Sequence, residues 1–83
     1  MRTVSAKAAF IKPNVVFHAS AWDAEATEKA APLMRRIEDY VYAALSVGMF
    51  GGEIAEDVMG MFPSIGTVEV VVRPGTVLVF IDG

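Results

Sequence analysis

The stretch from Thr67 to Asp82, TVEVVVRPGTVLVFID, constrains the fold more than any other part of this chain of 83 residues. It consists of two runs of β-branched and aromatic residues, which favour strands, on either side of a Pro-Gly pair. Because proline fixes φ at about −65°, Pro74-Gly75 suits the centre of a type I or II turn. The tight two-residue hairpin turns need a positive φ at their first central position, so a four-residue loop, Arg73 to Thr76, is favoured. The stretch predicts an antiparallel hairpin.

The expected hairpin has two faces of different character, since successive side chains of a strand point to opposite sides of the sheet. One face is entirely β-branched and must be buried. The other is apolar in the middle and polar at its ends, whereas a face that meets only water is normally more polar. A covering layer, from this chain or from another, is therefore expected there too. The pairs on the first face are Val72–Val77, Val70–Val79 and Val68–Ile81, and those on the second are Arg73–Thr76, Val71–Leu78, Glu69–Phe80 and Thr67–Asp82.

Upstream of the hairpin, the chain begins with one or two further strands. Residues 3–11 alternate weakly between apolar and polar and are rich in alanine, and Lys12-Pro13-Asn14 is a turn signal. The short apolar run at 15–17 is interpreted as a strand that ends near Ser20. These segments predict an N-terminal strand or hairpin in the same sheet.

A long helix is expected from Ala24 to about Val47, because apolar residues recur there at helical spacing. Acidic residues are concentrated at its start, where the helix dipole favours them. Pro32 leaves two alternatives open: it kinks one continuous helix, or residues 24–30 form a separate turn and Pro32 lies in the first turn of the main helix. The expected buried stripe consists of Leu33, Ile37, Tyr40, Val41, Ala44 and Leu45.

A second, shorter helix is expected from Glu53 to about Phe62, between a glycine-rich loop and Pro63. The order is then one or two strands, a long helix, a short helix and two strands. It predicts a single α+β domain of residues 1–83, in which both helices pack on one face of an antiparallel sheet. The apolar face of the short helix consists of Ile54, Val58, Met61 and Phe62.

The composition argues against several classes of function. The chain has no cysteine, so it has neither a disulfide framework nor thiolate chemistry. Its net charge is −3, whereas nucleic-acid binding needs a basic surface. Lys7 and Lys12 interrupt the apolar start, which is no signal peptide. The longest uncharged run, Tyr40–Gly52, is too short and glycine-rich to span a bilayer. We expect a cytoplasmic protein with no nucleic-acid and no membrane partner.

No combination of residues predicts a catalytic, metal or cofactor site. The single histidine, His18, has no acidic neighbour in the sequence and is interpreted as a structural or surface residue. The loop 48–52 precedes a helix, but Glu53 begins that helix and would repel an anion, and no P-loop lysine follows. Glu53, Glu56 and Asp57 are interpreted as a solvated helix face, because no calcium-loop pattern accompanies them. We expect no catalytic residue, no metal and no cofactor.

Three classes of function remain. The first is a non-enzymatic protein-binding module that acts stoichiometrically, as an inhibitor or adaptor. Small, acidic, cysteine-free α+β chains without catalytic residues are common among phage-encoded inhibitors of host systems, anti-CRISPR proteins included. The second is a self-assembling structural subunit of a phage particle or a bacterial shell. The third is a small enzyme whose site forms only at an oligomer interface, which the residue inventory disfavours.

The hydrophobic content favours association with another protein, whose identity the sequence does not give. Hydrophobic residues make up 54% of the chain, a high share for so small a domain. On the second face of the hairpin, Val71, Leu78 and Phe80 form an apolar centre inside a polar rim, as protein interfaces commonly do. We expect these three residues to meet another chain, most simply a second copy in a homodimer or higher oligomer. Met49 and Phe50, in the loop between the helices, are the second candidate for this role.

Overall fold

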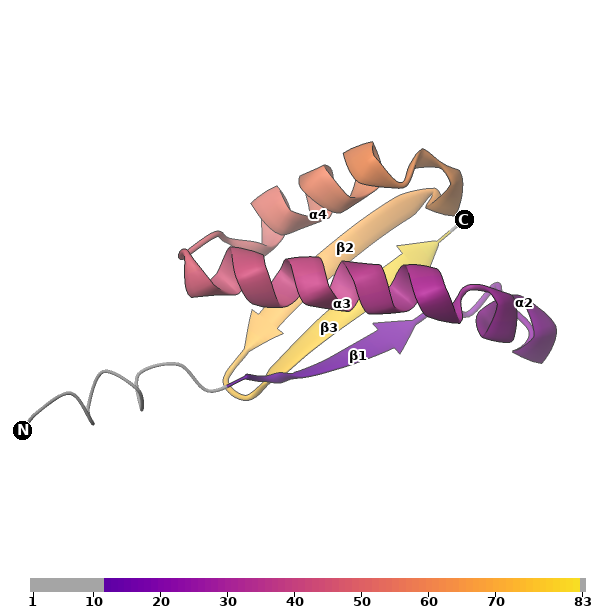
Figure 1. The fold of residues 1–83 in the computed structure, drawn as a ribbon, viewed down its shortest axis with the longest axis horizontal. Coiled ribbons are helices and arrows are strands. Elements are labelled where there is room, and N and C mark those ends of the chain that lie inside the picture. Colours follow the sequence, from indigo (N-terminus) through magenta and orange to yellow (C-terminus); the bar gives the residue numbers. More distant parts are fainter. Residues whose placement is uncertain (1–11, 83) are drawn as a thin grey trace, which may run out of the picture.

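The computed structural model describes residues 12–82, which form a three-stranded sheet with helices on one side (Figure 1). The strands are β1 (Asn14–His18), β2 (Thr67–Arg73) and β3 (Thr76–Asp82), in the order β1-β3-β2. The predicted α+β class, with helices packed on one face of a small sheet, is confirmed. The strand predicted at residues 3–11 lies outside the described part of the chain.

The sheet is mixed, whereas the sequence predicted an antiparallel one. β2 and β3 are antiparallel in the predicted register, with Val70 opposite Val79 and Val71 opposite Leu78. β1 lies parallel to β3. The cause is the path of the chain: α3 carries it back along the sheet and α4 carries it forward again, so β2 starts near the end of β1 (Figure 1). β2 therefore runs opposite to β1, and β3, which turns back between them, is parallel to β1.

The hairpin turn is tighter than the predicted four-residue loop. Arg73 and Thr76 pair as the last residues of their strands, so only Pro74 and Gly75 connect them. Gly75 has a φ of +78°. A proline followed by a residue with positive φ is the pattern of a type II turn, which needs glycine at the second central position. The proline excluded the primed turns as expected, but it did not require a longer loop.

The helices are α2 (Ala24–Lys29), α3 (Ala31–Ser46) and α4 (Gly51–Met61), followed by the short 3-10 helix η1 (Pro63–Ile65). The predicted long helix is divided at Ala30, and Pro32 lies in the first turn of α3, as in the second alternative. At that position the missing N–H of proline has no intrahelical partner to lose. α2 begins after Asp23, whose carboxylate accepts a hydrogen bond from Ala26 N at 2.8 Å. No helix between residues 12 and 82 is both long and apolar enough to cross a membrane.

The core lies between the helices and one face of the sheet. The strands contribute five side chains that are at most 7% exposed, and α3 and α4 contribute three each. Val72, predicted to be buried with its strand neighbours, is instead 47% exposed, because it lies at the end of β2 beside Gly51, where α4 begins. The buried residues are Ile37, Val41 and Ala44; Ile54, Ala55 and Val58; Ile65; and Val68, Val70, Val77, Val79 and Ile81.

Candidate functional site

The side of the sheet that faces away from the helices, called here the open face, carries an apolar row across all three strands. Val16 of β1 lies beside Leu78 of β3, and Leu78 lies opposite Val71 of β2. Val16 is 39% exposed, and the other two are half-buried by their neighbours within the sheet. No helix or strand among residues 12–82 covers this row, since α3 and α4 both pack on the other face.

Polar residues border the apolar row on both sides. On one side His18 lies next to Phe80, and the two rings are stacked with centroids 5.0 Å apart and planes inclined by 16°. Glu69 lies opposite Phe80 on β2. On the other side, Thr76 lies between Asn14 and Arg73. The open face therefore has an apolar centre and a mixed polar rim that carries both signs of charge, a pattern common in protein interfaces.

The structure brings together the three predicted interface residues of the hairpin and adds two that sequence reasoning missed. Val71, Leu78 and Phe80 are neighbours on the open face, all half-buried. Val16 and His18 extend this surface onto β1. Exposure alternates along β1, but its continuous apolar run from Val15 to Phe17 did not show this alternation in the sequence. What was missing was its neighbour: nothing in the sequence places β1 beside β3.

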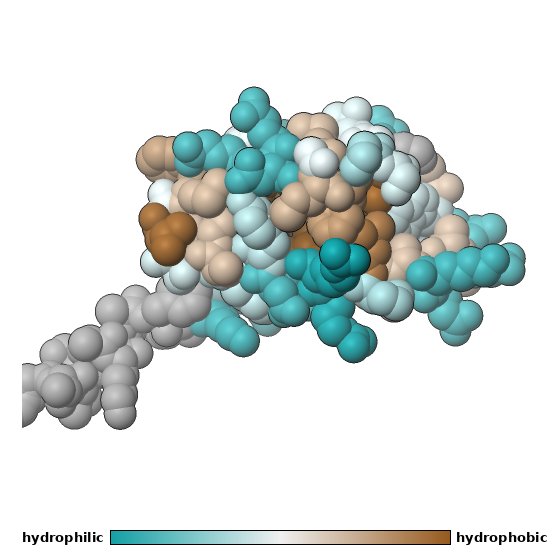
Figure 2. Space-filling view, turned by 45° about the horizontal axis from the view of Figure 1, so that its top comes forward, coloured by the Kyte–Doolittle hydropathy of each residue, from teal (hydrophilic) through white to brown (hydrophobic). Residues whose placement is uncertain are grey.

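Met49 and Phe50, the second predicted pair, point to different environments. Met49 is half-buried against the core, with its Sδ 3.8 Å from the Tyr40 hydroxyl. Phe50 is 76% exposed, as is Val47 at the end of α3. Figure 2 shows hydrophobic surface, in brown, at the end of the molecule where α3 leads into α4. Of the predicted pair, only Phe50 is therefore exposed.

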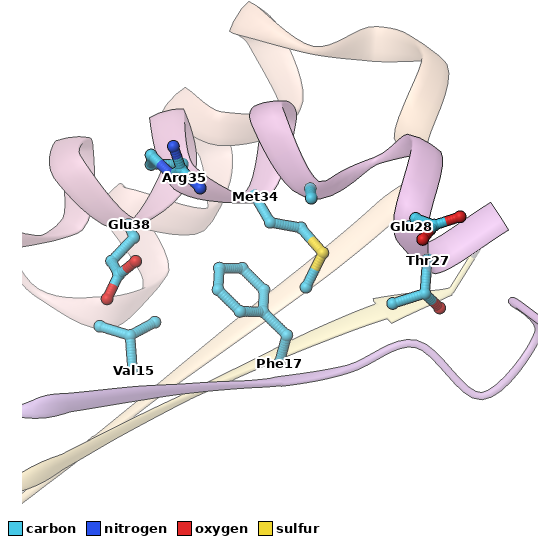
Figure 3. Close-up of a pocket in the computed structure, with 8 residues that line it drawn as sticks. Val15, Phe17, Thr27, Glu28, Met34, Arg35 and Glu38 are labelled. Atoms are coloured by element: carbon cyan, nitrogen blue, oxygen red, sulfur yellow. The ribbon is translucent and has the colours of Figure 1, made fainter. Parts of the chain in front are cut away.

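A groove of about 410 Å³ runs between β1 and the helices α2 and α3, and we call it the edge groove. Val15 and Phe17 of β1 form one wall, and Met34 lies over Phe17 (Figure 3). Glu38 lies over Val15, whereas Thr27 and Glu28 lie beyond Phe17 at the other end (Figure 3). The remaining lining residues are Ala31 and Arg35. The groove thus has an apolar floor and a charged rim, beside the outer edge of the sheet.

Two tyrosines of α3 donate hydrogen bonds to carboxylates near these surfaces. The Tyr42 hydroxyl donates to Glu38 at 3.1 Å, and partial burial together with this bond raises the pKa of Tyr42. The Lys12 ammonium lies over the Tyr42 ring, 4.8 Å from its centroid. The Tyr40 hydroxyl donates to Asp57 of α4, and this bond is the main cause of the raised pKa of Tyr40. These contacts hold Glu38 at the groove and tie α3 to α4.

The predicted acidic cluster on α4 has structural partners. Glu53 accepts a hydrogen bond from the Phe50 backbone N–H at 2.9 Å and so caps the helix start, while Asp57 holds Tyr40. Between residues 12 and 82, no group of three or more His, Cys, Asp or Glu side chains is placed to hold a metal ion. Comparison of the sequence with models of known families gives no match, nor do comparisons with curated proteins and with solved structures. The surfaces described above are therefore the basis for a functional hypothesis.

Proposed function

We propose that this protein is a small binding module that acts stoichiometrically, as an inhibitor or adaptor in the cytoplasm, and that the open face is its binding surface. The observation that supports this most is the apolar row of Val16, Leu78 and Val71, which no described element covers. A rim that includes Glu69 and Arg73 surrounds it. When a partner binds and removes such a surface from water, the free energy of the complex is lowered.

The composition and shape of the open face suit a protein partner better than a small molecule. The apolar row lies on a sheet surface rather than in an enclosed cavity, whereas small-molecule sites are concave and bury most of the ligand. Aromatic residues are enriched in protein interfaces, and the stacked pair of Phe80 and His18 offers a rigid ring at the edge of the row. The charged groups lie at the rim, where they orient a partner.

A charge placed at the centre of the open face tests this proposal. Leu78→Glu is expected to keep the circular dichroism spectrum of the wild type and to abolish capture of a partner from a bacterial lysate. The reason is that a bound partner would remove the new carboxylate from water, which costs free energy. The matched control is Thr76→Glu, which adds the same charge to the same strand and face, but at the rim opposite Arg73. A protein captured by the wild type and by Thr76→Glu, and lost with Leu78→Glu, is the expected result.

Two results would contradict the proposal. One is a captured protein that Leu78→Glu retains at wild-type level. The other is an unfolded Leu78→Glu variant combined with a wild type that is monomeric at high concentration and captures nothing.

The alternative function is a structural subunit of a phage particle or bacterial shell. The outer edge of β1, beside which no strand of residues 12–82 lies, favours it, since sheet edges can template assembly. Light scattering on the purified wild type separates the two functions. A subunit forms large closed or extended assemblies, whereas a binding module remains a monomer or a small oligomer.

A further inference from the structure

The outer edge of β1 presents backbone hydrogen-bonding groups beside the edge groove. Asn14 N donates to Gly75 O at 3.0 Å, so the backbone groups of Asn14 point toward β3. In a parallel ladder these directions alternate from residue to residue, so the N–H and C=O groups of Val15 and Phe17 point outward. No strand among residues 12–82 lies beyond them. From Asn14 to His18 the edge lacks the lysine, proline or bulge with which sheet edges are normally protected.

We propose that this edge binds a second copy of the chain, with the two β1 strands antiparallel about a two-fold axis at Val16. In that register Val15 of one copy lies opposite Phe17 of the other, at both ends of the contact. Each such pair exchanges two backbone hydrogen bonds, because both residues direct their backbone groups outward. Val16 then faces its own counterpart. The result is a six-stranded sheet in the order β2-β3-β1-β1-β3-β2.

Charges along the edge groove are self-complementary under this two-fold axis. Glu38 lies over Val15, and Met34, the neighbour of Arg35, lies over Phe17 (Figure 3). Since Val15 and Phe17 oppose each other in the dimer, Glu38 of each copy faces the Arg35 region of the other. Lys12 precedes β1 and Glu28 lies beyond Phe17, so these two opposite charges also meet. A parallel pairing of the two β1 edges would instead put the two helix layers on opposite faces of the sheet, so these charges would not meet.

The dimer would also enlarge the open face. Val16 pairs with its counterpart as a closely spaced pair, so the apolar row becomes continuous from Val71 of one copy to Val71 of the other. The inference stands apart from the proposed partner-binding role, because the edge and the open face use different groups. If both hold, one partner surface spans two copies.

A reciprocal charge exchange tests the dimer by sedimentation velocity. Glu38→Arg alone makes both contacts between positions 38 and 35 basic on each side, and Arg35→Glu alone makes them acidic on each side, so each variant is expected to raise the dimer dissociation constant roughly tenfold or more. An equimolar mixture of the two variants restores opposite charges at both contacts and is expected to form a heterodimer. Glu56→Arg, an equal charge change on the exposed surface of α4, is the control and is expected to dimerise like the wild type.

Amide hydrogen exchange provides a second measurement. The Val15 and Phe17 amides are expected to exchange slowly in the dimer and rapidly on dilution. Leu78→Glu is expected to leave this dimer intact, which separates it from the proposed use of the open face. The dimer is overturned if the wild type is monomeric at millimolar concentration, or if both single charge variants dimerise like the wild type. Slow exchange of both amides in a monomer would assign the edge to residues 1–11 and equally overturn it.

Discussion

The two faces of the sheet are built from the same three strands and differ mainly in what covers them. On the helix side, Val77 and Val79 of the central strand are fully buried. On the open face, Leu78 lies between them in the sequence, on the same strand, and stays half-buried. Both sets of side chains are apolar. The difference therefore lies in the number of layers: α3 and α4 are enough to cover one face of a three-stranded sheet, and none of the described chain is left for the other.

This difference shows which apolar residues stabilise the fold and which are available for binding. A fully buried valine exchanges its contact with water for packing contacts, a gain of about 1.5–3 kcal/mol per side chain. Leu78 and its neighbours obtain only part of that gain within one chain. The remainder becomes available when a second layer is added, which is why the open face is the binding surface in our proposal.

The largest expected effect comes from placing the same charge on each face. Val79→Glu buries a carboxylate in the core, and the desolvation cost is comparable to the whole stability of a small domain, about 5–15 kcal/mol. We expect this variant to lose its cooperative thermal transition, as followed by circular dichroism. Leu78→Glu, one residue away, is expected to keep it. A folded Val79→Glu variant with the wild-type melting temperature would show that the two faces do not differ in this way.

Most of this contrast could be predicted from the hairpin sequence alone. Side chains alternate between the two faces with a period of two along Thr67–Asp82, and the Pro-Gly pair sets the register of the hairpin. Both are local properties of the sequence, so both could be predicted from it. The β-branched residues identified the buried face, apart from Val72 at the end of the strand. Similarly, helical spacing identified Ile37 and Val41 as buried.

The rest depends on contacts between distant parts of the chain. β1 and β3 are separated by the whole helical layer in the sequence, and no local pattern records their pairing. The open face was consequently predicted without Val16, and the edge groove was not predicted. The division of the helix at Ala30 was left open, because Pro32 fits both a kinked helix and a helix start.

A smaller effect is expected where α4 approaches the sheet. A Cβ added to Gly51 would lie 2.5 Å from the Val70 carbonyl oxygen, whereas one added to Gly52 would meet nothing within 4 Å. Gly51→Ala is therefore expected to move α4 and to cost about 1–3 kcal/mol in the free energy of unfolding. Gly52→Ala is the matched control and is expected to be neutral, or to stabilise the protein by up to about 1 kcal/mol. Urea unfolding measures both.

Equal stability of these two glycine variants would show that the close approach of α4 to β2 does not constrain the helix layer. In that case the covered face would tolerate rearrangement, and the contrast with the open face would be weaker than proposed.

The smallest expected effect concerns the outer side of the helix layer, where Tyr40 of α3 donates a hydrogen bond to Asp57 of α4. This bond, followed by partial burial, raises the pKa of Tyr40 above its ordinary value of 10.0. The unfolded chain therefore releases the Tyr40 proton first as the pH rises. The stability that the bond contributes is complete below pH 10.0 and is lost as the pH rises through the folded-state pKa.

We expect the free energy of unfolding to fall more steeply with pH in this range for the wild type than for Tyr40→Phe. Urea unfolding at a series of alkaline pH values measures the two slopes. Tyr42→Phe, which leaves the bond between α3 and α4 in place, measures the separate contribution that the raised pKa of Tyr42 makes to the slope. Identical slopes for the wild type and Tyr40→Phe would show that this bond does not hold the two helices together over the covered face.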